Sequence, residues 1–134
     1  MNPPRSVALF AAAVGACDLA TGIALVAAPR ATLALLGVVP PPAEPAFQRW
    51  IGAFVLAVGL AYLYPFLLDR KRLGARLATI FEVTAIARTA VALVAGGAIL
   101  AGELDRSWAG VPAFDAAVAA AQVVLLRRRE WGRG

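Results

Sequence analysis

Four long apolar stretches dominate the pattern of hydrophobic and polar positions along this chain. They cover residues 6–28, 51–68, 77–100 and 111–126. These stretches match or approach the roughly 20 residues that an α-helix needs to cross a bilayer, and the fourth is the shortest. The pattern therefore predicts an all-α, membrane-embedded four-helix bundle, in a single integral membrane domain that takes up all 134 residues.

Polar and proline-rich segments mark the ends of these stretches. Residues 39–45 contain four prolines, which cannot lie inside a helix and so predict a loop before the second stretch. Residues 69–72 are all charged and close that stretch, and residues 102–110 form a polar turn before the fourth. Residues 30–37 are too few to cross the bilayer, so we expect a short interfacial helical turn after the first helix.

The basic residues between the stretches predict the orientation, because Lys and Arg are retained on the cytoplasmic side of a membrane. One side of the predicted bundle carries nine of them: Arg5, Arg70, Lys71, Arg72, Arg76, Arg127, Arg128, Arg129 and Arg133. The opposite side carries three, which are Arg30, Arg49 and Arg106. We therefore expect a multi-pass protein of the cytoplasmic membrane with both termini in the cytoplasm.

The composition agrees with a membrane protein and excludes several other classes. Hydrophobic residues make up 61% of the chain and charged residues 16%, whereas soluble domains are roughly 45–50% apolar. The basic residues flank apolar runs and are not set among stacking aromatics, so the lipid bilayer is the expected partner and nucleic acid is not. The chain has no His and one Cys, so we expect no internal disulfide, no metal site and no cofactor.

Small residues recur at a spacing that lets helices approach closely in lipid. Such pairs occur at Ala11 and Gly15 in the first stretch, at Ala53, Ala57 and Ala61 in the second, and at Ala117 and Ala121 in the fourth. They favour a compact bundle.

Cys17 closes a segment, residues 14–17, that resembles the cleavage box of a lipoprotein. The alternative is that Cys17 is a small residue packed between helices. Hydrophobicity continues for about ten residues past Cys17, which suits a full membrane span better than a short signal region. We therefore favour the packed cysteine.

Charged residues inside the apolar stretches are the most informative positions, because one facing hydrocarbon costs roughly 2.5–3.5 kcal/mol. With a rise of ~1.5 Å per residue, Asp18 and Arg88 both lie ~18 Å from the cytoplasmic side and Asp115 lies ~22 Å from it. Glu82 lies lower, near the level of Tyr62, and Arg49 lies at the outer mouth. The predicted buried polar cluster consists of Asp18, Arg49, Tyr62, Glu82, Arg88 and Asp115.

The sequence leaves the role of these residues open. Asp18, Arg88 and Asp115 form either a structural clamp between helices or part of a ligand or catalytic site. Glu82 is either a protonated functional acid, because no basic group shares its level, or an anchor that pairs with Arg76 or Arg72.

Several short segments resemble small four-helix DoxX-like bacterial membrane proteins. They are Ala-Ala-Pro at 27–29, Leu-Leu-Gly at 35–37, Arg-Trp-Ile-Gly-Ala at 49–53, Gly-Leu at 59–60, and a third helix with Glu82 and Arg88. The resemblance implies this architecture in a bacterial inner membrane. Some members of the group are similar to hydrophobic subunits of quinone-linked oxidoreductases, but no family active site can be transferred to this chain.

Three functions agree with these features. The first is a non-enzymatic one: an accessory subunit of a larger membrane complex, or a binder of a lipophilic small molecule through the buried polar cluster. The second is a small membrane enzyme, an isomerase or cyclase of a lipophile, with intramembrane carboxylates as acid and base. The third is a proton-coupled transporter that would use Asp18. We expect the first.

Overall fold

The computed structural model describes residues 3–39, 44–68 and 70–128 and is helical over these residues, with no β-strand among them. Its α-helices are α1 (Arg5–Ala27), α2 (Pro29–Leu35), α3 (Pro45–Leu63), α4 (Leu73–Leu100) and α5 (Gly110–Arg127). Short 3₁₀ helices precede or follow them: η1 (Tyr64–Leu67), η2 (Arg70–Arg72) and η3 (Arg106–Ala109). The predicted all-α class is confirmed, and α2 is the expected helical turn after the first helix.

Four of the helical segments are long and apolar enough to cross a membrane. They are Arg5–Ala27, Pro45–Leu67, Arg70–Leu100 and Arg106–Arg127. Each spans 22 residues or more, so each meets the ~20 residues that a bilayer requires. The chain therefore has the architecture of a multi-pass membrane protein.

Two helices begin earlier than the apolar pattern predicts. The helix α3 starts at Pro45 instead of residue 51, because proline is compatible with the first turn of a helix, where its missing N–H is not needed. The helix α4 starts at Leu73 instead of residue 77, and so includes Arg76. Arg76 is half-buried there, and its Nη1 atom is buried without a hydrogen-bond partner among the described residues.

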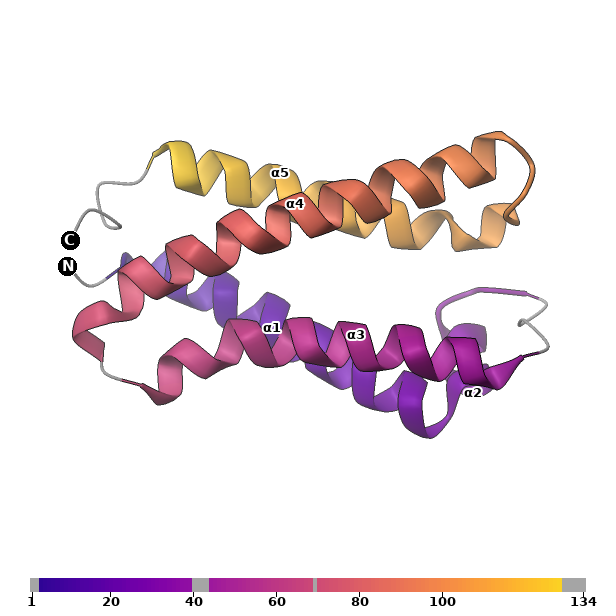
Figure 1. Cartoon of the computed structure of the whole chain (residues 1–134), viewed down its shortest axis with the longest axis horizontal. Helices are drawn as coiled ribbons and strands as arrows, with labels where there is room; N and C mark the ends of the chain where they lie inside the picture. Colours follow the sequence, from indigo (N-terminus) through magenta and orange to yellow (C-terminus); the bar gives the residue numbers. More distant parts are fainter. Residues whose placement is uncertain (1–2, 40–43, 69, 129–134) are drawn as a thin grey trace.

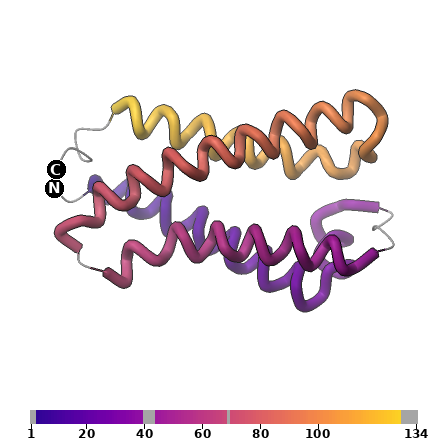
Figure 2. The backbone as a smooth tube through the Cα atoms, in the orientation of Figure 1, coloured from indigo at the N-terminus to yellow at the C-terminus, as the bar shows by residue number. Residues whose placement is uncertain are grey.

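The long helices form two antiparallel pairs, α1 with α3 and α4 with α5 (Figure 1). The start of α1, the turn between α3 and α4 and the end of α5 lie together at one end, which we call the terminal end (Figure 2). The helix α2 and the turn between α4 and α5 lie at the opposite end, which we call the loop end. The first and third apolar stretches thus run in the same direction, which brings equal depths of α1 and α4 to the same level.

Glycines allow α1 and α3 to approach until their backbones touch. A Cβ atom on Gly59 would lie 2.4 Å from the backbone nitrogen of Leu19, and one on Gly22 would lie 2.4 Å from that of Leu56. Gly52 packs in the same way, with Leu25 Cβ at 2.7 Å from its Cβ position. Gly52 and Gly59, which are seven residues apart on α3, therefore both face α1 at close contact. Ala53 and Ala57, which the small-residue spacing suggested, are exposed.

Two apolar clusters hold the pairs together. The larger lies toward the terminal end and contains Tyr62, Leu77 and Phe81, all with fully buried side chains. The smaller lies at the loop end, where Leu25, Leu33 and Val38 pack with Trp108 of η3. At this end the backbone N–H of Val39 also donates to Ser107 Oγ at 3.4 Å. Hydrogen bonds from Ser107 lower the pKa of nearby Asp105, which caps η3.

Candidate functional site

Arg88 joins three helices by two ion pairs in the middle of the bundle. Its Nη2 donates to Asp18 Oδ2 on α1 and its Nη1 donates to Asp115 Oδ1 on α5. The side chains of Arg88 and Asp18 are each 7% exposed, and that of Asp115 is 13% exposed. The three side chains form a buried triad with two carboxylates for one guanidinium, which we call the Arg88 triad.

The helix register explains why the triad forms. On α1 the buried side chains recur every three or four residues along one stripe, which contains Val14, Asp18 and Gly22. On α4 the corresponding stripe runs through Phe81, Thr84 and Arg88. Because both stripes face the interior, the charges at equal depth meet there.

Two aromatic rings also lie close to the guanidinium group. The Arg88 Cζ atom lies 5.8 Å from the ring centroid of Tyr62 on α3 and 5.6 Å from that of Phe114 on α5. Both distances are within the range of cation–π attraction. Arg88, on α4, therefore contacts side chains from the three other long helices, α1, α3 and α5.

A neutral hydrogen-bond network lies about one turn of α4 from the triad. The Gln122 side-chain amide donates to Tyr62 Oη and, at 2.7 Å, to Thr84 Oγ1. Tyr62 Oη and Thr84 Oγ1 are 3.0 Å apart, and the Thr84 hydroxyl donates to the backbone carbonyl of Ile80 at 2.6 Å. Because the hydroxyl hydrogen of Thr84 is directed to the Ile80 carbonyl, the Tyr62 hydroxyl is the donor in its hydrogen bond with Thr84. The network connects α3, α4 and α5.

Two buried polar atoms of this site have no hydrogen-bond partner among the described residues. One is Arg88 Nε, a donor, and the other is Gln122 Oε1, an acceptor. Gln122 is fully buried. An unpaired buried donor or acceptor costs roughly 1–3 kcal/mol, so these atoms are candidates to bind a polar group or a water molecule.

The structure brings four of the six predicted site residues together: Asp18, Tyr62, Arg88 and Asp115. The predicted inclusion of Arg49 and Glu82 is wrong, because both are exposed on the outer surface of their helices. Glu82 lies six residues before Arg88 on the same helix. At 3.6 residues per turn, this spacing points the Glu82 side chain away from the buried stripe that contains Arg88. Arg49 follows the buried Gln48 and faces outward in the same way.

Thr84 and Gln122 belong to the site although the charge pattern did not identify them. Gln122 is the only amide in the last apolar stretch and follows Asp115 by seven residues, which is two helical turns along one face. That spacing is a usable signal. Thr84 has no such signal, because a threonine in a membrane helix also satisfies its hydroxyl on its own backbone.

Burial along α4 changes at Arg88. Toward the terminal end, its inward stripe is fully or nearly fully buried, as at Leu77, Phe81 and Ala85. Toward the loop end, the same stripe continues through the small residues Ala92 and Gly96, which are only half-buried. Packing between the two helix pairs is therefore tighter on the terminal side of the triad than on the loop side.

No group of three or more potential metal-ligating side chains occurs among the described residues. Comparisons of the chain with protein-family models, with curated protein sequences and with solved structures found no match. The function is therefore inferred from the site itself.

Proposed function

We propose that this chain is a bacterial inner-membrane protein, with both termini in the cytoplasm, that binds a lipophilic molecule without chemically changing it. The polar head of that molecule would contact the Arg88 triad, and its apolar part would lie between the helix pairs toward the loop end. The observation that carries the proposal is the unpaired Arg88 Nε–H beside half-buried small residues of α4.

Three features of the site support binding of a lipophile with a polar head. Arg88 Nε–H is a buried donor without a partner among the described residues. Asp115 is the most exposed member of the triad, at 13% against 7% for Asp18 and Arg88. Ala92 and Gly96 follow Arg88 along the same face of α4, are half-buried and carry little or no side chain, so an apolar tail could approach the helix there.

A binding role is favoured over the enzymatic alternative by the ion pairs. Acid–base catalysis requires a carboxyl group that exchanges its proton with the substrate. Asp18 and Asp115 are both held by the guanidinium group of Arg88. The proton-coupled transporter is disfavoured for the same reason, because its coupling carboxylate would be Asp18. An accessory role in a larger membrane complex agrees with the proposal, as does membership of the DoxX-like group.

The proposal is tested by enlarging a side chain of α4 on the loop side of the triad. In Ala92→Leu the larger side chain occupies the half-buried face of α4, whereas in the control Ala90→Leu it enters the exposed face. Lipophiles that co-purify with each protein are extracted and quantified by mass spectrometry, and binding of decylubiquinone is measured on the same samples.

We expect Ala92→Leu to lose most of the bound lipophile and Ala90→Leu to retain it, with similar thermal stability in detergent. Equal retention in both variants contradicts the proposal. Wild-type protein that carries no lipophile and binds none contradicts it as well.

A further inference from the structure

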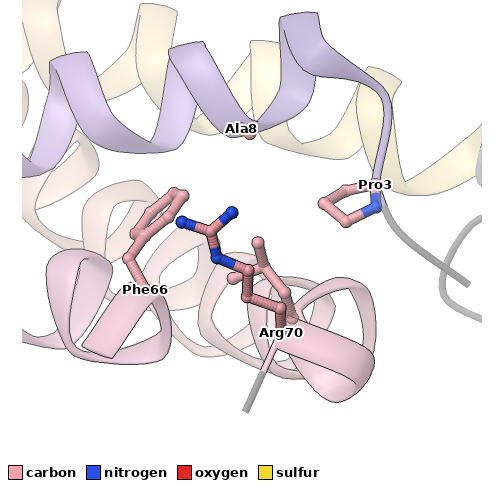
Figure 3. A pocket seen from close by; sticks show the side chains of 5 residues that line it. Pro3, Ala8, Phe66 and Arg70 are labelled. Atoms are coloured by element: carbon pink, nitrogen blue, oxygen red, sulfur yellow. The ribbon is translucent and has the colours of Figure 1, made fainter. Parts of the chain in front are cut away.

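A groove opens at the terminal end, far from the Arg88 triad. It is lined by Pro3, Ala8, Phe66, Arg70 and Leu73 and has a volume of about 340 Å³ (Figure 3). This volume is within the range of roughly 300–1,000 Å³ that is usual for small-molecule sites. All but one of the lining side chains are apolar.

The groove forms where three separate segments of the chain meet. Pro3 and Ala8 lie at the start of α1, Phe66 lies in η1, and Arg70 and Leu73 lie where α4 begins. Pro65 ends the regular hydrogen bonding of α3 and converts its last turn to the 3₁₀ helix η1, which places Phe66 at the wall of the groove. The side chain of Arg70 extends into the groove toward α1, beside the ring of Phe66 (Figure 3).

The electrostatics of this end favour an anion. Six exposed basic residues lie at the terminal end among the described residues: Arg5, Arg70, Lys71, Arg72, Arg127 and Arg128. The loop end has no such excess, because its exposed Arg30, Arg49 and Arg106 are matched by the exposed Glu44, Glu103 and Asp105. The groove lies where the membrane-spanning helices end, at the depth of lipid headgroups.

We propose that this groove binds one anionic phospholipid. The guanidinium group of Arg70 contacts the lipid phosphate, and an acyl chain lies against Phe66 and Leu73 as it enters the membrane. An anionic lipid matches both parts of the groove, because it carries a negative head on an apolar chain. A soluble anion would match only Arg70 and would leave the apolar walls exposed. The site is independent of the lipophile proposed at the Arg88 triad.

Two pairs of matched variants test the site by native mass spectrometry of the full chain in detergent, titrated with dioleoylphosphatidylglycerol. Arg70→Gln and Arg72→Gln remove the same charge, but only Arg70 lines the groove. We expect Arg70→Gln to weaken binding about fivefold or more, which is the effect of one basic side chain near an anionic lipid. Arg72→Gln should change binding less than about twofold, because its charge contributes only at a distance.

The second pair tests the apolar wall. Ala8→Leu fills the groove without any change of charge, and Ala13→Leu adds the same volume on the exposed face of α1. We expect only Ala8→Leu to reduce phosphatidylglycerol binding, and we expect wild-type protein to bind dioleoylphosphatidylcholine at least fivefold more weakly. Equal losses in Arg70→Gln and Arg72→Gln, or unchanged binding in Ala8→Leu, would overturn the proposal.

Discussion

At the scale of single residues, the ion pairs of the Arg88 triad compensate the charges that lie inside the bundle. Breaking a buried ion pair by removal of one partner leaves an uncompensated charge, which costs far more than removal of the whole group. Asp18 and Asp115 both depend on the same guanidinium. Arg88 is therefore the member of the triad whose loss is least tolerated.

We predict that Arg88→Met lowers the free energy of unfolding by about 3–5 kcal/mol, because two carboxylates then lose their counter-charge. The triple variant Asp18→Asn, Arg88→Met, Asp115→Asn should be milder than the sum of its single substitutions. Unfolding in detergent, measured by circular dichroism, gives these free energies. Additive effects of the three substitutions would rule out a coupled triad.

The Tyr62 hydroxyl gives a second prediction at this scale. Tyr62→Phe removes the oxygen that contacts both Gln122 and Thr84, and we expect it to destabilise the bundle by about 1–3 kcal/mol. Tyr64→Phe is the control, because Tyr64 is 59% exposed and its hydroxyl is not part of the network. The same unfolding measurement compares them. An equal, small effect of both substitutions would show that the buried network contributes little.

At the scale of helices, the α1–α3 pair is the most closely packed element of the structure. Its four glycines, Gly15, Gly22, Gly52 and Gly59, bring one backbone against the other. Association of helices in lipid depends on van der Waals contact and not on the hydrophobic effect, so this close approach is a direct source of stability. No such close approach occurs at Gly96 of α4, where an added Cβ atom would lie 4.0 Å from Pro112 Cβ of α5.

We predict that Gly59→Ala destabilises the protein by about 1–3 kcal/mol, because the added methyl group overlaps the backbone at Leu19 and Gly15. Gly97→Ala is the matched control, and it should be neutral or stabilising by up to about 1 kcal/mol through helix propensity. Thermal unfolding in one detergent measures both. A neutral result for Gly59→Ala would show that α1 and α3 are not held at this separation.

At the scale of the whole molecule, the two helix pairs meet through the triad, the neutral network and the two apolar clusters. The excess of basic residues at the terminal end supports the proposed cytoplasmic location of that end, because Lys and Arg are retained on the cytoplasmic side of a membrane. The proposed orientation thus rests on the charge of short loops and not on how the helices pack.

The orientation is tested by cysteine labelling in intact cells, with Cys17 first replaced by Ala. Glu103→Cys in the turn between α4 and α5 should react with a membrane-impermeant maleimide added outside. Lys71→Cys in η2 should react only after the membrane is opened. Labelling of Lys71→Cys from outside would reverse the proposed topology.

The sequence by itself determined the fold class, the four candidate spans within a few residues, and the shared level of three interior charges. A membrane-spanning helix must satisfy its own backbone and match a fixed thickness of hydrocarbon, so its position depends only on local composition. Depth then follows from a constant rise per residue, which is why the meeting of Asp18, Arg88 and Asp115 was predictable.

Only the tertiary structure decided which face of each helix turns inward. Glu82 and Arg49 are charged residues like Arg88, yet rotation of their helices leaves both exposed, while the uncharged Gln122 is fully buried. Helix rotation is set by packing against neighbours, here by the glycines of α1 and α3 and the aromatic core around Phe81. These contacts join residues far apart in the chain. Stretches that are apolar all round, such as α1 and α4, carry little local information about which face will be covered.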